Sequence, residues 1–265
     1  AEVLCHVCLS GGIGRLAVHQ PSREAKEHFK LVNMRDNLVR HRTSIKNQIG
    51  AFERDYGANP YTGELFEKSQ NISCMEGILQ GELKHLSEQI ERLDTRIAAL
   101  SKDDAIVTLL RTIPGIGVLT AFALRHKIET IDRFQDPSHL SSYFGFGVRQ
   151  HQSGETFVKG KITKTGNGLI RKLLIQGAQV VRAKCPENIP LYFPTLGLPV
   201  LMKDRRHANK VVAAVARKNL TFVHQIWQKR TPFNLDTYRE RRSQKSLPPL
   251  PSMRAAELEI TTCLS

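Results

Sequence analysis

Regularly spaced apolar positions predict a long helix near the start of the chain. Ser22 offers an N-cap oxygen, and Glu24 lies in the first turn, where the helix dipole favours an acid. A helical seam with two polar interruptions then follows alternating steps of three and four residues, at Leu31, Met34, Leu38, His41, Ile45, Gln48 and Phe52. The turn-forming residues from Tyr56 to Gly63 end this helix.

A second helix follows with a stricter pattern. Its apolar positions repeat in steps of 3-4-3-4-3 without exception, at Leu83, Leu86, Ile90, Leu93, Ile97 and Leu100. This spacing is typical of a coiled-coil seam, and the preceding loop favours two helices that fold back on each other. The seam could pack within its own domain or join two chains, and its regularity favours a homo-oligomer.

The pattern after residue 105 predicts a compact, mainly helical domain. Helices are expected over Ile106–Arg111 and Leu119–Lys127, and the alternation from Thr156 to Thr163 favours a short β-hairpin or an irregular loop. Asn167 is expected to cap a helix that reaches Pro186, and a last helix spans His207–Trp227. The chain thus divides into residues 1–21, a helical connector over 22–105, this domain over 106–230 and a weakly ordered basic and proline-rich tail over 231–265.

The distribution of charge along the chain indicates which class of partner the protein binds. The net charge is +14, and the span from Gly145 to Arg230 holds sixteen Lys or Arg against three acids. A basic module that faces a polyanion explains this concentration better than a generally basic surface does, although a solvated basic face would carry the same charge.

Cysteine usage and hydropathy set further bounds. Five scattered cysteines indicate a reducing, cytoplasmic setting, and Cys5 and Cys8 lack a second close pair, so we assign no metal site to them. No apolar run reaches the roughly 18 residues of a membrane span, so no membrane partner is expected.

The segment Ile113-Pro114-Gly115-Ile116-Gly117 is predicted to join two helices as a helix-hairpin-helix. Pro114 fixes the entry to the turn, and Gly115 and Gly117 permit positive φ and remove side chains that would hold a phosphate away. Backbone N–H groups at the start of the next helix can then bind a phosphate oxygen without reading a base. The alternative is a glycine-rich corner between helices that binds no ligand.

A second candidate region follows the hairpin. Gln152-Ser153-Gly154 is by its spacing an ordinary turn, yet a basic segment follows it closely. The candidates for neutralising a phosphate or binding it beside a helix start are Lys159, Lys161, Lys164, Asn167, Arg171 and Lys172.

These motifs together resemble one family of transposases. The residues that carry the resemblance are Leu110–Gly117, Phe134, Leu140–Gly145, Gln152–Gly154, Ile162–Asn167, Arg171–Leu174 and Ala213–Lys218. The chain is similar over about 22–230 to insertion-sequence transposases that pair an N-terminal DEDD, RuvC-like domain with a C-terminal serine domain, relatives of the Piv DNA invertases.

The resemblance implies that residues 22–105 are the family's coiled-coil connector and that Ser153 matches the serine that links covalently to DNA. It also implies DNA as the partner, with a structured bridge RNA as a guide. The family's four metal-binding carboxylates lie upstream of the connector, and no early aspartate here corresponds to them, because the first is Asp36. We therefore expect no cofactor in this chain, Mg²⁺ only with the DEDD domain, and no full activity of the chain by itself.

The leading hypothesis is a DNA-associated transposase-family chain for transposition or site-specific recombination, with Ser153 as the candidate nucleophile. Two alternatives remain open. One is a non-catalytic nucleic-acid-binding remnant built on the same parts, and the other is a coiled-coil interaction module whose charge is incidental.

Overall fold

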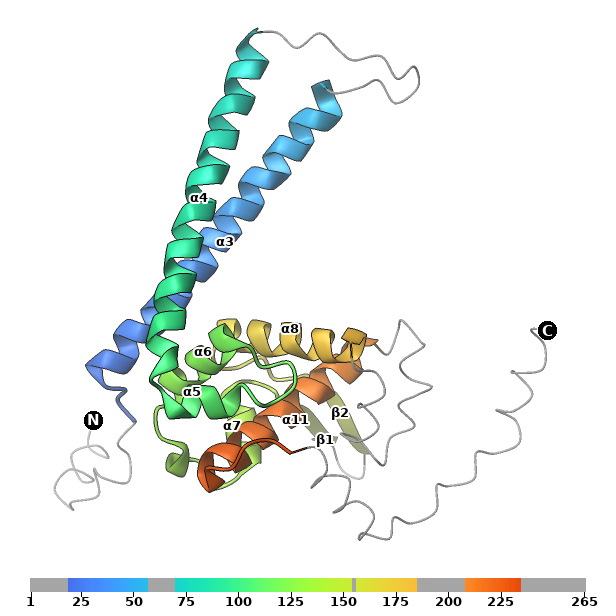
Figure 1. The fold of residues 1–265 in the computed structure, drawn as a ribbon. Helices are drawn as coiled ribbons and strands as arrows, with labels where there is room; N and C mark the ends of the chain where they lie inside the picture. The colour runs from blue at the N-terminus through green and yellow to red at the C-terminus, as the bar shows by residue number, and fades with distance from the viewer. Residues whose placement is uncertain (1–18, 57–69, 154–155, 185–207, 235–265) are drawn as a thin grey trace, which may run out of the picture. The chain divides into compact units, whose positions relative to one another are not determined.

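The computed structural model describes residues 19–56, 70–153, 156–184 and 208–234 (Figure 1). The described part of the chain is mainly helical, which confirms the predicted fold class. Its helices are α3 (Arg23–Tyr56), α4 (Gln70–Lys102), α5 (Ala105–Leu110), α6 (Val118–Ile128), η1 (Ile131–Arg133), α7 (Pro137–Tyr143), α8 (Gly168–Lys184) and α11 (Ala208–Lys229). Two strands, β1 (Val148–Ser153) and β2 (Thr156–Ile162), lie between α7 and α8.

The contacts divide the chain into two units. The first takes the residues up to Leu100 together with Phe122–Thr130, and the second takes Ser101–Ala121 and the residues from Ile131 onward. Most of α6 therefore clusters with the first unit, which no local pattern in the sequence indicated. The domain boundaries at 21, 105 and 230 stay predictions.

Helices α3 and α4 are the long elements of the first unit (Figure 1). Ser22 caps α3 as predicted, because its Oγ accepts a hydrogen bond from the Ala25 N–H at 3.1 Å. Along α4, Leu86, Ile90 and Ile97 are buried at the predicted seam positions. Arg35 of α3 donates to both carboxylate oxygens of Asp94 of α4 and so links the two helices.

The predicted seam of α3 is partly wrong. Met34 is 55% exposed, and His41 and Gln48 are also exposed. The buried and half-buried line instead runs in steps of four and three through Leu31, Arg35, Leu38, Arg42, Ile45, Ile49 and Phe52. Arginine can occupy such a line because its methylene stem covers apolar surface while its guanidinium reaches the edge. Use of the seam as a coiled coil between chains stays a prediction.

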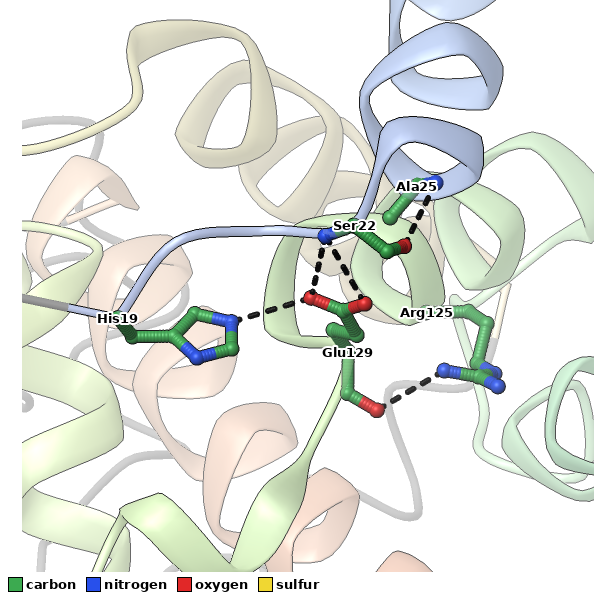
Figure 2. A network of polar contacts seen from close by, with 5 residues as sticks. All are labelled: His19, Ser22, Ala25, Arg125 and Glu129. Carbon is green, nitrogen blue, oxygen red and sulfur yellow. Dashed lines mark hydrogen bonds and ion pairs between the residues drawn. The ribbon is translucent and has the colours of Figure 1, made fainter.

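A carboxylate clip joins the start of α3 to the end of α6 (Figure 2). Both oxygens of Glu129 accept from the Ser22 N–H, at 3.1 and 3.2 Å, and His19 Nε2 lies 3.1 Å from one of them. Arg125 donates to the Glu129 carbonyl at 2.9 Å, which holds Glu129 at φ +60°. Hydrogen bonding from Ser22 and the proximity of His19 lower the pKa of Glu129.

The core of the second unit lies around α11, which packs on α8, α7, α5 and η1. Val215, Val223 and Trp227 are among its buried side chains. His224 is also buried, and its Nε2 lies 2.9 Å from the Phe134 carbonyl oxygen, so the ring has a polar partner. This helix begins and ends within two residues of its predicted bounds.

Strands β1 and β2 form a hairpin, one of the two alternatives predicted here, but the segment Thr156–Thr163 for which it was predicted supplies only the second strand. They pair antiparallel from Val148 opposite Ile162 to Ser153 opposite Thr156, with an irregularity between Val148 and Gln150. The residues between α8 and α11, Cys5, Cys8 and the tail from residue 235 lie outside the described residues.

Candidate nucleic-acid interface

The Ile113–Gly117 turn joins α5 to the first turn of α6, the order of elements that the sequence predicted. Asp104 begins α5 by accepting from the N–H groups of Ile106 and Val107, so the helix that leads into the turn is well capped. Gly115 adopts φ +81°, a left-handed conformation that a side chain would disfavour. The turn closes with a hydrogen bond from the Ile116 N–H to the Ile113 carbonyl at 3.0 Å.

The missing side chain of Gly115 makes room for α8. A Cβ atom on Gly115 would lie 2.6 Å from the carbonyl oxygen of Gly177 and 2.8 Å from Val181, and a Cβ on Gly177 would overlap the Gly115 carbonyl. The two backbones therefore approach as only a pair of glycines permits. This contact gives Gly115 a packing role inside the second unit.

Helix α11 fixes the same turn through Asn219. This side chain is fully buried, and its Nδ2 donates to the Pro114 carbonyl at 3.3 Å. The Thr112 hydroxyl accepts from the Phe233 N–H at 2.9 Å, just before the turn. The turn is thus held by residues from three separate segments of the unit.

Gly117 lies on the side of the turn that faces open space. It is exposed, and a Cβ atom there would meet nothing within 4 Å among the described residues. Its carbonyl accepts from the Ala121 N–H at 2.9 Å, which starts α6, and the first N–H groups of a helix lack intrahelical partners. Of the two turn glycines, Gly117 is the one whose surroundings leave space for a phosphate.

Ser153 is the last residue of β1 and pairs with Thr156 across the end of the hairpin. Gly154 and Glu155 between them lie outside the described residues. Lys159 lies on β2 opposite Gln150, in the same hairpin as Ser153.

The segment from Thr163 to Asn167 connects the hairpin to α8 and contains the exposed Lys164, while Lys161 is exposed at the end of β2. Asn167 caps α8 as predicted, because its Oδ1 accepts from the Ile170 N–H at 3.0 Å. The side chain of Asn167 thus serves the helix start itself. Lys172 is half-buried in the first turns of α8.

Arg171 of α8 points back to the loops. Its Nη1 donates to the carbonyls of Phe144 and Thr165, at 3.1 and 3.2 Å. The predicted phosphate ligand therefore also has partners within the protein.

The electrostatics of this region are one-sided. The described residues from Gly145 to Asn234 contain thirteen Lys or Arg and no Asp or Glu. Lys218 of α11 is half-buried with its Nζ 5.6 Å from the centre of the Phe222 ring, and burial lowers its pKa. Along α8 and α11, no acidic side chain would repel a bound polyanion.

The structure groups the predicted residues into two sets along α8. Asn167, Arg171 and Lys172 lie at its N-terminus and Lys164 lies in the segment that leads into it, whereas Gly115 of the turn packs against Gly177. At a rise of about 1.5 Å per residue, the start of α8 and Gly177 lie roughly 14 Å apart along the helix.

Sequence reasoning missed Gly177 and Asn219. A glycine in the middle of a helical pattern disfavours the helix and often marks a close backbone approach, which was the available indication for Gly177. An asparagine within the apolar face of α11 was the indication for Asn219.

No three His, Cys, Asp or Glu side chains gather into a possible metal site within the described ranges. None of the described helices is long and apolar enough to cross a membrane.

Comparison with known proteins confirms the resemblance seen in the sequence. The Transposase IS116/IS110/IS902 family matches residues 107–193, which include the turn, the hairpin and α8. The transposase for insertion sequence element IS1111A of Coxiella burnetii is 28% identical over 214 residues, 76% of this chain and 58% of that protein.

Two further relatives extend this result. A probable family 20 transposase of Pseudomonas aeruginosa is 25% identical over 250 residues, 87% of this chain and 71% of that protein. The pilin gene-inverting protein of Moraxella bovis is 30% identical over 159 residues, 57% of this chain and 47% of that protein. The matches thus span between about half and seven-tenths of these relatives' lengths.

Proposed function

We propose that this chain, whose residues 107–193 match the IS116/IS110/IS902 family of transposases, binds DNA and supplies the nucleophile for transposition or site-specific recombination. The observation that carries the DNA-binding part is the concentration of positive charge from Gly145 to Arg230, where sixteen Lys or Arg stand against three acids and no acid lies on α8 or α11. Such a surface binds a phosphate backbone by neutralising it and releasing its counterions.

The backbone would be held at two places. The first is the N-terminus of α8, where the helix dipole favours an anion and which follows the exposed Lys161 and Lys164 in the chain. The N–H groups at the open Gly117 side of the turn offer the second place. Both contacts read phosphates and no bases, so they position the DNA and leave sequence choice to other contacts, for which a guide RNA is a candidate.

Ser153 is the proposed nucleophile. Its hydroxyl oxygen attacks a backbone phosphorus, a new O–P bond forms to the serine, and the P–O bond to one neighbouring nucleotide breaks. The leaving oxygen takes up a proton, and the phosphodiester is conserved in the serine link, so that a DNA hydroxyl can reverse the step and seal the strand. Nearby cations stabilise the charge on the phosphate as the bonds change.

The test is the covalent protein–DNA adduct formed by the intact parent transposase with its own element DNA. We expect Ser153→Ala to abolish the adduct, and Ser142→Ala to preserve it, because Ser142 is an exposed serine of the same unit. An undiminished adduct in Ser153→Ala would rule out the nucleophile. Salt-dependent binding without cleavage by the parent would favour the non-catalytic module, and no binding at low salt would favour the interaction module.

We also propose that the chain forms a homo-oligomer through α4. The exposed Met75 and Ile78 of α4 favour pairing between chains, whereas Leu86, Ile90 and Ile97 are already buried within the chain. Sedimentation of the purified chain tests this, and a monomer at micromolar concentration would contradict it.

A further inference from the structure

We propose that Arg171 is a positioning residue that fixes the direction of the β1–β2 hairpin, and that it acts through this brace rather than by contacting DNA phosphate. The inference rests on the proposed function only where it concerns Ser153, since the brace itself is a property of the free protein.

The first observation is the geometry of the guanidinium. One nitrogen of Arg171, Nη1, donates to the Phe144 carbonyl at 3.1 Å and to the Thr165 carbonyl at 3.2 Å. The two acceptors lie in different loops, one after α7 and one before α8. Hydrogen bonds from a charged donor are stronger than neutral ones, so a single side chain ties both loops to the first turn of α8.

The second observation is that the two loops touch backbone to backbone. Gly145 and Gly166 have φ values of +76° and +82°. A Cβ on Gly145 would overlap the Thr165 carbonyl, and one on Gly166 would overlap the Tyr143 carbonyl. Side chains are excluded at both positions, so the loops meet through backbone groups, and Arg171 Nη1 adds a charged donor to this contact.

The third observation is where this contact lies. Strand β1 begins directly after Gly147, and β2 ends directly before Thr163. The Thr163 N–H donates to the Gly147 carbonyl at 2.8 Å, and the Lys164 N–H donates to the Gly145 carbonyl at 3.1 Å. The brace therefore holds both ends of the hairpin base, and the far end of the same hairpin carries Ser153.

These observations separate Arg171 from the neighbouring lysines. Lys161 and Lys164 are exposed, whereas Arg171 is half-buried with its Nη1 directed at two carbonyls. Removing Arg171 should loosen the hairpin without removing a phosphate contact. Removing Lys161 should remove a phosphate contact and leave the hairpin unchanged. Lys161→Gln also removes one positive charge and is therefore the matched control for Arg171→Gln.

The direct test is amide hydrogen exchange on the free full chain, without DNA. In Arg171→Gln we expect the Thr163 and Lys164 amides to exchange about tenfold faster or more, while core amides of α11 keep their protection. In Lys161→Gln both sets should be unchanged. Unchanged exchange of Thr163 and Lys164 in Arg171→Gln would overturn the proposal.

Arg171→Lys covers the case in which Arg171→Gln loses the fold of the whole unit. It keeps the charge and loses the planar guanidinium, so we expect faster exchange confined to Thr163 and Lys164. Wild-type exchange at those two amides in Arg171→Lys would then overturn the proposal.

A second experiment uses the intact parent transposase. It distinguishes an effect of Arg171 on the position of the hairpin from an effect on DNA affinity. Arg171→Lys should bind DNA with nearly wild-type affinity and salt dependence, yet form the Ser153 adduct about tenfold more slowly or worse. A normal adduct rate in Arg171→Lys together with a salt slope lowered by about one in Arg171→Gln would identify a phosphate contact and overturn the proposal. If the wild type fails to bind DNA, the proposed function fails, while the exchange experiment still decides the brace.

Discussion

Helices α3 and α4 of the first unit and helices α8 and α11 of the second all carry many lysines and arginines, but they differ in how this charge is balanced. The first pair holds twelve Lys or Arg against ten Asp or Glu, and several of these form ion pairs, such as Arg35 with Asp94 and Arg40 with Asp36. The second pair holds no acid at all.

The difference shows what each set of charges can do. In the first unit, opposite charges meet within the protein and hold helices together or decorate a solvated surface. In the second unit, Arg171 and Arg149 donate to backbone carbonyls, and Lys161 and Lys164 are exposed. Positive side chains that pair with acids of the same protein indicate a structural role. Positive side chains without nearby acids favour binding to a polyanionic partner.

The largest expected effect concerns the scaffold of the basic unit. Gly115→Ala forces a side chain into a left-handed conformation and against Gly177, so we expect a loss of about 3 kcal/mol or more in unfolding free energy. Urea unfolding of the chain measures it. Gly117→Ala is the matched control, with open space for its methyl, and should cost less than about 1 kcal/mol. Equal losses in the two variants would mean that the Gly115–Gly177 contact does not hold the turn.

A smaller effect is expected for the balanced charges of the first unit. Arg35 and Asp94 pair through two hydrogen bonds on a partly exposed surface, so their coupling should be about 0.5–1 kcal/mol. A double-mutant cycle with Arg35→Ala and Asp94→Ala measures the coupling, and repeating it in high salt should reduce it. A coupling of zero would show that this pair does not join α3 to α4.

The smallest effect is the pH dependence of the Glu129 clip. Its pKa is lowered in the folded state, so the clip stabilises the protein fully above the ordinary carboxyl pKa of about 4.5 and loses this contribution as the pH falls through the lowered value. Glu129→Gln should therefore be less stable than wild type at pH 6, and the gap should close on acidification below about pH 4. Unfolding midpoints across this range give the comparison, and a gap that widens in acid would contradict the assignment.

Local patterns predicted the parts of the fold that local forces determine. The cap at Asn167, the hairpin and the α4 seam follow from turn chemistry and periodicity. The α3 seam was predicted one position out at Met34, His41 and Gln48, because arginines share the true line and carry no apolar signal. The sequence could not show that Gly115 meets Gly177 or that Ser22 meets Glu129, since such pairs are distant in the chain and leave no periodic trace.

The same limit applies to the candidate site. Composition predicted a basic surface, and the structure shows that Lys161 and Lys164 are exposed. Composition could not separate them from Arg171, whose role depends on two carbonyls in distant loops. Ser153 was singled out by family resemblance, because a serine before a glycine is an ordinary turn pair.

The most direct test of the account is the salt dependence of DNA binding by the purified chain. The wild-type chain should lose affinity for DNA steeply as the salt concentration rises. The double variant Lys161→Gln, Lys164→Gln should show a shallower slope of log affinity against log salt, by about 0.9 for each phosphate that is no longer neutralised. Lys26→Gln with Lys30→Gln removes two exposed lysines from α3 and should leave the slope unchanged. Equal flattening by both pairs, or binding that ignores salt, would contradict the claim that the second unit's unbalanced charge holds DNA.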